Sequence, residues 1–206
     1  MKIYLIRHGE TDWNRQMRFQ GRENVPLNDA GITQAKACGK ALAGRGITAV
    51  YTSPLQRAVD TGKEIAAWAG LTPEDVRVMP ELIERDLGEF SGKCVSDRSS
   101  YFSLSASEDA GGMEPFSEVL ERMKQAIFKI AAKNDAAAAV VSHGAAINVL
   151  LAGLSDFAVG TGKTKLYNGG VSILEGNGED GFCIRACNQK PEDLDDIVSL
   201  SGSCTR

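Results

Sequence analysis

Both histidines of this chain lie in the same kind of local sequence. Each follows a short apolar run and precedes a glycine, as in Leu5-Ile6-Arg7-His8-Gly9 and Val140-Val141-Ser142-His143-Gly144. A glycine lets backbone N–H groups come close to a ligand. If the fold brings the two units together, both imidazoles can face one ligand site.

Two arginines near these histidines indicate which ligand that is. Arg7 directly precedes His8, and Arg57 is expected one turn into a helix that follows a strand. A guanidinium group matches phosphate oxygens with two parallel hydrogen bonds. Asn14 can donate further hydrogen bonds, and the helix expected after Gly144 favours anions at its N-terminus. These residue types predict a phosphate site.

Each of these residues has a simpler structural explanation when it is taken alone. A strand-end histidine is commonly a polar loop residue, Arg57 a solvated helix charge, and Glu81 and Glu84 surface acids. Two histidines can also bind zinc, but no HxxxH spacing and no Cys–His cluster accompanies them. The repeated strand-His-Gly unit favours a shared phosphate site over these alternatives.

The alternation of apolar runs predicts the elements that must position these residues. Strands are expected over residues 2–6, 49–51, 77–82, 137–142, 166–175 and 182–186, and helices over 29–43, 54–69, 115–133 and 145–154. This order predicts an α/β fold, a three-layer α/β/α sandwich with a mainly parallel central sheet and a late antiparallel element. Ligands of such sheets bind outside the carboxyl ends of the strands, so both imidazoles should emerge at one edge.

Capping residues mark the first two predicted helices. Asn28 is the expected N-cap of the helix over 29–43. Ser53 is the expected N-cap of the helix over 54–69, with Pro54 at its first position. These signals place Arg57 near the end of the preceding strand.

One catalytic domain over residues 1–206 accounts for the whole pattern. The periodicity fails over about 92–112, which we interpret as a short lid-like insertion that selects the substrate. Its residues Lys93 and Arg98 are candidates for binding a second anionic group of the substrate. A polar, partly loose tail is expected over about 188–206.

The composition limits the partners and the location of the chain. A net charge of −4 is typical neither of a general nucleic-acid binder nor of a protein held on anionic membranes. No apolar run approaches the length of a membrane-spanning helix or of a signal peptide. Five cysteines without a framework spacing predict free thiols and a cytoplasmic location. The oligomeric state is left open.

Five ordered motifs extend the histidine pattern over most of residues 1–175. They are Leu5-Ile6-Arg7-His8-Gly9-Glu10-Thr11 with Asn14, Arg18-Phe19-Gln20-Gly21-Arg22, Ser53-Pro54-Leu55-Gln56-Arg57-Ala58, Leu82-Ile83-Glu84-Arg85-Asp86-Leu87-Gly88 and Ser142-His143-Gly144. In type and order they resemble the histidine phosphatase superfamily, also called phosphoglycerate mutase-like. The late strand from Asn168 to Leu174 is similar to that family as well.

The resemblance implies a role for each site residue. His8 is the expected nucleophile and Glu84 the expected proton donor, while the phosphoryl oxygens are held by Arg7, Arg57 and His143. Further substrate contacts are expected at Asn14, Gln20, Gly21, Glu81 and Gly144. No metal or cofactor is implied, because fixed cations and N–H donors supply the charge that a phosphoryl-transfer transition state needs.

Departures from the family pattern bear on the substrate. Phe90-Ser91-Gly92 stands where Trp-Glu-Gly is common, and Gly111-Gly112-Met113-Glu114 departs from Gly-Gly-Glu-Ser. The 92–112 segment is also short for a mutase. We therefore expect a phosphatase of small phosphomonoesters. The alternatives are a phosphoglycerate mutase and a non-catalytic phosphate-binding module, which has no need for Glu84.

Two glycine-rich stretches imitate nucleotide-binding motifs. Residues 160–164 end like a P-loop, but Phe157 stands where its first glycine belongs. Residues 176–181 match GxGxxG, but a strand is expected to follow them instead of a helix. We interpret this second stretch as a hairpin turn.

Overall fold

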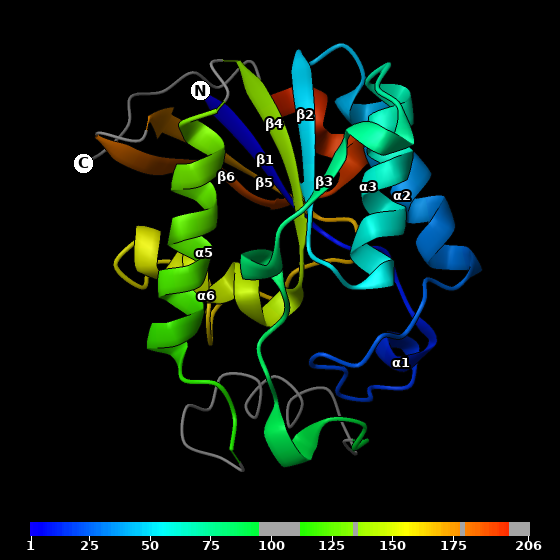
Figure 1. The fold of residues 1–206 in the computed structure, drawn as a ribbon, viewed down its shortest axis with the longest axis vertical. Coiled ribbons are helices and arrows are strands. Elements are labelled where there is room, and N and C mark those ends of the chain that lie inside the picture. Colours follow the sequence, from blue (N-terminus) through cyan, green and yellow to red (C-terminus); the bar gives the residue numbers. More distant parts are fainter. Residues whose placement is uncertain (95–111, 134–135, 178–179, 198–206) are drawn as a thin grey trace.

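A computed structural model describes residues 1–94, 112–133, 136–177 and 180–197 (Figure 1). The strands in these ranges are β1 (Lys2–Arg7), β2 (Ile47–Thr52), β3 (Val76–Val78), β4 (Ala137–Ser142), β5 (Val171–Asn177) and β6 (Gly181–Gln189). The α-helices are α1 (Asp12–Arg15), α2 (Asp29–Leu42), α3 (Gln56–Trp68), α5 (Phe116–Ala131), α6 (Gly144–Leu154) and α7 (Leu194–Ile197). Short 3₁₀ turns are η1 (Pro73–Asp75), η2 (Pro80–Leu82), η3 (Gly88–Phe90) and η4 (Pro191–Asp193).

The described strands form one sheet in the order β3-β2-β4-β1-β5-β6. The first four in this order pair in parallel, whereas β5 is antiparallel to both β1 and β6. The predicted mainly parallel sheet with a late antiparallel element is therefore confirmed. The GxGxxG stretch falls at the connection between β5 and β6, where a hairpin was predicted.

Two layers of helices cover the sheet, with α2 and α3 on one face and α5 and α6 on the other (Figure 1). The period of two along β1 decides which side chains reach which layer. Ile3 and Leu5 are fully buried in the cluster that contains the apolar faces of α5 and α6. Tyr4 and Ile6 are buried in the cluster on the opposite face, with α2 and α3.

Three predicted boundaries are wrong. The late strand begins at Val171 and not at residue 166. The N-cap of α3 is Leu55, which makes no side-chain cap bond, and the hydroxyl of Ser53 binds His143 and the Leu55 N–H just before the helix. The third strand stops at Val78 and does not reach residue 82. Pro80 follows it, and a proline has no N–H to donate to a strand ladder.

The described part of the predicted polar tail, residues 188–197, contains regular structure. Strand β6 continues to Gln189, and α7 follows η4. Leu194 is fully buried beneath the α2 and α3 layer, and Asp195 forms an ion pair with Arg45 at 2.5 Å. Residues 198–206 and most of the 92–112 insertion lie outside the described residues, so their assignment and the single-domain boundary stay predictions.

The cysteines differ from the sequence expectation at one position. Cys38, Cys94 and Cys187 are free thiols, but Cys183 is disulfide-bonded. The prediction of free thiols throughout is therefore wrong for Cys183. None of the helices that the structure describes is both long and apolar enough to cross a bilayer.

Candidate active site

Three parallel strands deliver side chains of the site to one edge of the sheet. The backbone hydrogen bonds between these strands continue one residue beyond the strand ends. His8 N–H donates to the Ser142 carbonyl at 3.0 Å, and Ser53 N–H donates to the Val141 carbonyl at 3.0 Å. His143 follows Ser142 directly. The imidazole rings of His8 and His143 consequently lie close together, with centroids 5.1 Å apart.

Hydrogen bonds determine which nitrogen of His8 carries its proton. Nδ1 lies 2.6 Å from the Gly9 carbonyl oxygen, which can only accept, so Nδ1 is the protonated nitrogen. Nε2 then presents its lone pair, which accepts a hydrogen bond from Arg57 Nε at 3.2 Å. Burial, followed by the charges of Arg57 and Arg7, holds the pKa of His8 well below its ordinary value. The imidazole is thus neutral and nucleophilic at neutral pH.

Backbone carbonyls fix the guanidinium groups around this nucleophile. Arg57 is 1% exposed and donates to the carbonyls of Glu23 at 2.6 Å and Gly21 at 2.9 Å. Arg7 donates to the Leu166 carbonyl at 2.6 Å. A carbonyl has no net charge, so these bonds orient the two cations without neutralising them. Cations fixed in advance are what an electrostatically stabilised transition state requires.

His143 lies behind His8, fully buried, and is bonded to a hydroxyl. Its Nε2 lies 2.6 Å from Ser53 Oγ, which also accepts from Leu55 N–H at 3.3 Å. If the Ser53 hydroxyl donates to Nε2, its proton is satisfied and Nδ1 carries the ring proton. Nδ1 has no hydrogen-bond partner in the described part of the chain. Burial, then Arg57 and His8, lowers the pKa of His143, so it can offer this N–H as a neutral donor.

Glu84 is held by the N-terminus of α6. The backbone N–H groups of Ala145 and Ala146 donate to its two carboxylate oxygens at 3.2 and 2.9 Å. The N–H of Arg85 adds a bond of 2.8 Å to Oε1. Three backbone donors therefore hold this carboxylate at the N-terminus of α6, which begins at Gly144.

A pocket of about 680 Å³ connects these groups. The predicted site residues that line it are Arg7, His8, Asn14, Gln20, Gly21, Arg57, Glu84 and Gly144. His143 is adjacent through its ring contact with His8. Thr161, Gly162 and Thr164, from the stretch that imitates a P-loop, also line this pocket, and the loop follows a helix instead of a strand.

Glu81 is a correction to the predicted set. Its carboxylate binds Lys129 of α5 at 2.6 Å, and it does not line the pocket. The hydrogen bond from Lys129 also lowers its pKa. Glu81 lies in η2 and Glu84 lies after it, outside any helix or strand, so their spacing in the sequence does not give the two side chains a common direction.

Lys93, one of the predicted specificity residues, is engaged within its own segment. Its ammonium group lies 3.5 Å from the Glu89 carboxylate and 5.0 Å from the centre of the Phe90 ring. It does not line the pocket. Arg98 lies outside the described residues. The predicted specificity role of the insertion therefore gains no support from Lys93.

Sequence reasoning missed three supporting residues. Asn168 donates from Nδ2 to the His8 carbonyl at 3.1 Å and to Asn14 Oδ1 at 3.2 Å. With Oδ1 occupied, Asn14 keeps its own amide N–H₂ for a ligand. Thr61 accepts from Gly9 N–H at 3.1 Å, and Ser53 binds His143. Ser53 was expected as a helix cap and Asn168 as part of the late strand, but neither signal indicates these partners.

The described ranges contain no candidate metal site. No group of three or more His, Cys, Asp or Glu side chains there is arranged to hold a metal ion.

Known proteins agree with this geometry. A model of the histidine phosphatase superfamily (branch 1) matches residues 3–189. The chain is 32% identical over 174 residues to the uncharacterized phosphatase PhoE of Bacillus subtilis, covering 84% of this chain and 87% of that one. It is 33% identical over 184 residues to the metal-independent phosphoserine phosphatase of Arabidopsis thaliana, covering 84% and 75% of the two chains. A solved mycobacterial glucosyl-3-phosphoglycerate phosphatase superimposes with a TM-score of 0.78 at 27% identity, over 91% of this chain and 98% of that one.

Proposed function

The chain belongs to the histidine phosphatase superfamily, and from this premise we propose that it hydrolyses small phosphomonoesters through a phosphohistidine at His8. The observation that carries the proposal is the state of His8. A neutral imidazole whose Nε2 lone pair accepts a hydrogen bond from an oriented arginine is a nucleophile matched to an anionic phosphoryl group.

In the first step, His8 Nε2 attacks phosphorus and the bond from phosphorus to the leaving oxygen breaks. Glu84, in its protonated form, gives that oxygen its proton, so an alcohol leaves instead of an alkoxide. The bond from Arg57 Nε to His8 Nε2 must then pass to a phosphoryl oxygen. The Gly9 carbonyl, bonded to Nδ1–H, stabilises the positive charge that develops on the ring.

In the second step, water attacks the phosphohistidine and the phosphorus–nitrogen bond breaks. The Glu84 carboxylate takes a proton from this water. The three N–H groups that bind Glu84 suit the carboxylate form that this step needs. Inorganic phosphate leaves, and His8 returns to its neutral form.

Arg7, Arg57 and His143 hold the equatorial oxygens in both steps, and Asn14 adds a further donor. The charge of that transition state is spread over these oxygens, so such contacts carry much of the catalysis. Because the side chains already supply positive charge, we expect the reaction to need no metal. The relative named metal-independent phosphoserine phosphatase supports this expectation.

The substrate is proposed as a phosphorylated metabolite with a polar organic part. Two relatives are named for phosphoserine and for glucosyl-3-phosphoglycerate, which makes these compounds the first to test. The pocket lining also includes Thr164, Lys165 and Tyr167, which suit polar or anionic groups. A screen of phosphorylated metabolites ranked by kcat/KM would identify the preferred class.

The cytoplasmic location and the lack of a nucleic-acid partner stay proposals. The net charge of −4 and the free thiols of Cys38, Cys94 and Cys187 support them. The disulfide of Cys183 is typical of oxidising compartments instead. Cell fractionation with localisation of the full chain is the direct test.

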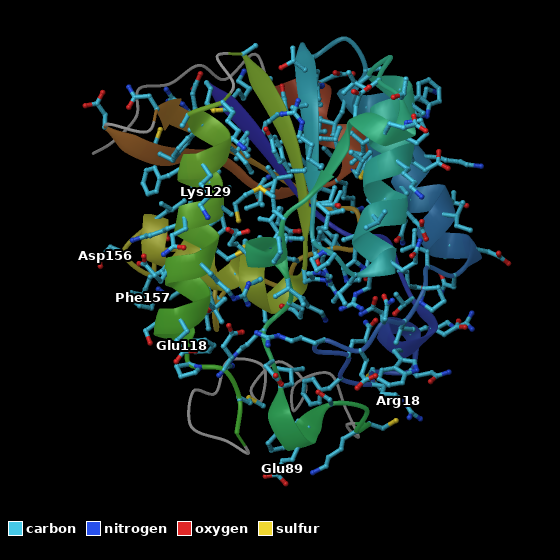
Figure 2. The ribbon with its side chains drawn as sticks, viewed as in Figure 1. Arg18, Glu89, Glu118, Lys129, Asp156 and Phe157 are labelled. Carbon is cyan, nitrogen blue, oxygen red and sulfur yellow. The ribbon has the colours of Figure 1, made fainter. Side chains whose placement is uncertain are left out.

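Trapping the intermediate tests the proposal. Rapid quench with a phosphate-labelled substrate should give an adduct that is acid-labile and alkali-stable, as expected of a phosphohistidine. The adduct should be absent in His8→Ala and present in Lys129→Ala, a control on the surface of α5 (Figure 2). An adduct stable to acid would instead indicate an ester and overturn the assignment.

A further inference from the structure

The segment that carries Glu84 has little regular structure of its own. Residues 83–87 lie between η2 and η3, outside any helix or strand. A general acid must nevertheless be held close to its productive position, because a displacement of about 1 Å can cost about 10²-fold in rate. Contacts from other elements must therefore fix this backbone.

Arg122 of α5 supplies the first of these contacts. Its Nη1 donates to the Glu81 carbonyl at 2.8 Å and to the Ile83 carbonyl at 2.6 Å. The side chain is 16% exposed. One guanidinium nitrogen thus bridges two backbone carbonyls just before Glu84.

Glu114 holds Arg122 and the other end of the segment at the same time. Its two carboxylate oxygens accept from Arg122 Nε at 2.8 Å and Nη2 at 2.9 Å, a bidentate pair. Its Oε2 also accepts from Asp86 N–H at 3.1 Å, and its own N–H donates to the Asp86 carbonyl at 2.9 Å. Burial acts to raise the pKa of Glu114, but the bonds and charge of Arg122 outweigh it and lower the pKa.

Arg22 links this arrangement to the phosphoryl-binding side of the pocket. It donates from Nε to the Glu84 carbonyl at 3.3 Å and lies 3.2 Å from the Glu114 carboxylate. The preceding residue, Gly21, accepts from Arg57. The backbone on both sides of Glu84 is therefore bound to one buried ion pair, with a connection to the arginine beside His8.

We propose that Glu114 and Arg122 are positioning residues that aim the Glu84 carboxylate at the leaving oxygen. They act through the backbone of residues 81–86 and do not touch the substrate. The proposal rests on the proposed function, because it needs Glu84 to be the proton donor.

The test compares two substrates in the variants Glu114→Gln and Arg122→Ala. An alkyl phosphate such as glycerol phosphate needs protonation of its leaving oxygen, whereas p-nitrophenyl phosphate has a leaving group that hardly needs it. The rate compared is the single-turnover release of the alcohol, because the later hydrolysis of the phosphohistidine is common to both substrates. We expect this rate on the alkyl phosphate to fall about 10- to 100-fold, below the roughly 10²–10⁴-fold that general acid catalysis supplies. On p-nitrophenyl phosphate the same rate should stay within about 3-fold of the wild-type value.

Matched variants separate positioning from general damage. Arg122→Lys keeps the charge but loses the planar guanidinium that binds two carbonyls and two carboxylate oxygens. Its activity on the alkyl phosphate should therefore be as low as that of Arg122→Ala. Lys129→Ala, on the same helix, breaks an exposed ion pair to Glu81 and should leave both substrates unaffected. If Glu114→Gln and Arg122→Ala do not fold, Arg22→Ala takes their place, because this side chain is 41% exposed. It should lower the rate on the alkyl phosphate selectively, by a smaller factor.

Parallel losses on both substrates in variants with an unchanged Tm would overturn the proposal. Full activity on the alkyl phosphate would overturn it too. If Glu84→Gln lowers the rate mainly on the alkyl phosphate while Glu114→Gln does not, the positioning role of Glu114 is disproved and the role of Glu84 stands. If Glu84→Gln itself shows no selectivity, the assignment of Glu84 as proton donor has failed.

Discussion

The two sides of the pocket are built by different means. His8, Ser53 and His143 follow strand ends and are held by backbone bonds that continue the sheet. Glu84 instead lies in an irregular segment whose backbone is bound by the side chains of Arg122 and Glu114. Its carboxylate accepts hydrogen bonds from the backbone at the start of α6. The phosphoryl-binding side therefore has a geometry that follows from the fold, while proton donation depends on a few side chains that can be changed without disturbing the sheet.

The difference in burial follows the same division. His8 is 2% exposed and Arg57 1%, whereas the side chains around Glu84 are 8% exposed for Glu114, 16% for Arg122 and 41% for Arg22. The exposed ion pairs of Arg22 are weak and are screened by salt, while the buried donors of the phosphoryl-binding side are not. We expect mutations on the phosphoryl-binding side to remove catalysis, and mutations around Glu84 to change its dependence on the substrate.

The largest effect is expected for His8→Ala. Removing the nucleophile of a covalent mechanism should lower kcat by at least about 10⁴-fold on every phosphomonoester. The measurement is steady-state hydrolysis of both an alkyl phosphate and p-nitrophenyl phosphate, with circular dichroism to show an intact fold. Turnover at the wild-type rate would disprove the role of His8 and with it the division drawn above.

Glu84→Gln should have the next largest effect and should depend on the substrate. Loss of the general acid is expected to cost about 10²–10⁴-fold on alkyl phosphates. The loss on p-nitrophenyl phosphate should be much smaller, unless hydrolysis of the phosphohistidine limits both. Single-turnover kinetics distinguish these two steps, because only the first releases the alcohol.

Ser53→Ala should weaken the phosphoryl-binding side modestly by releasing His143. One hydrogen bond of about 1.4 kcal/mol corresponds to roughly a tenfold loss in kcat/KM. The chain has only two histidines, so ¹⁵N-histidine NMR resolves each ring. We expect Nδ1-protonated rings in the wild type and a change at His143 alone in the variant. An Nε2-protonated His143 in the wild type would contradict the donor assigned to it.

Stability should depend on pH in a separate window for each side of the pocket. The pKa values of His8 and His143 are lowered from 6.5, so below pH 6.5 the unfolded chain binds protons that the folded chain does not. Their contribution is complete above pH 6.5 and declines on acidification by up to about 1.4 kcal/mol per pH unit for each histidine. Glu114, lowered from 4.5, contributes above pH 4.5 and loses its contribution below it.

Urea unfolding at a series of pH values measures both windows. The variant Glu114→Gln should flatten the profile below pH 4.5 and leave the decline that begins at pH 6.5 unchanged. A profile that is flat between pH 6.5 and 4.5 in the wild type would contradict the lowered histidine pKa values.

The smallest effect is expected from chelation. Activity should be unchanged after prolonged EDTA treatment, because the arginines and backbone donors already supply the positive charge near phosphorus. Inactivation that only an added divalent cation reverses would show that side-chain cations are insufficient, and would point to metal-assisted chemistry.

The sequence by itself determined the sheet and the residues at its carboxyl edge. His8 and His143 directly follow apolar strands, so the alternation of strands and helices was enough to place both at the carboxyl edge, while the pairing of β1 with β4 put the two rings side by side. Arg57 begins the helix after the next strand, and the matched motif added Glu84. These are local relations between a residue and the end of its own element, which a linear pattern can express.

Only the tertiary structure decided how those residues are held. Ser53 reads as a helix cap, but its hydroxyl binds a histidine 90 positions away. Glu81 reads as a neighbour of Glu84 but binds α5, while Glu114 and Arg122, distant in the chain, hold the backbone around Glu84. A polar side chain bonds to whichever partner the packed elements bring within about 3 Å, and a sequence pattern contains no record of that distance.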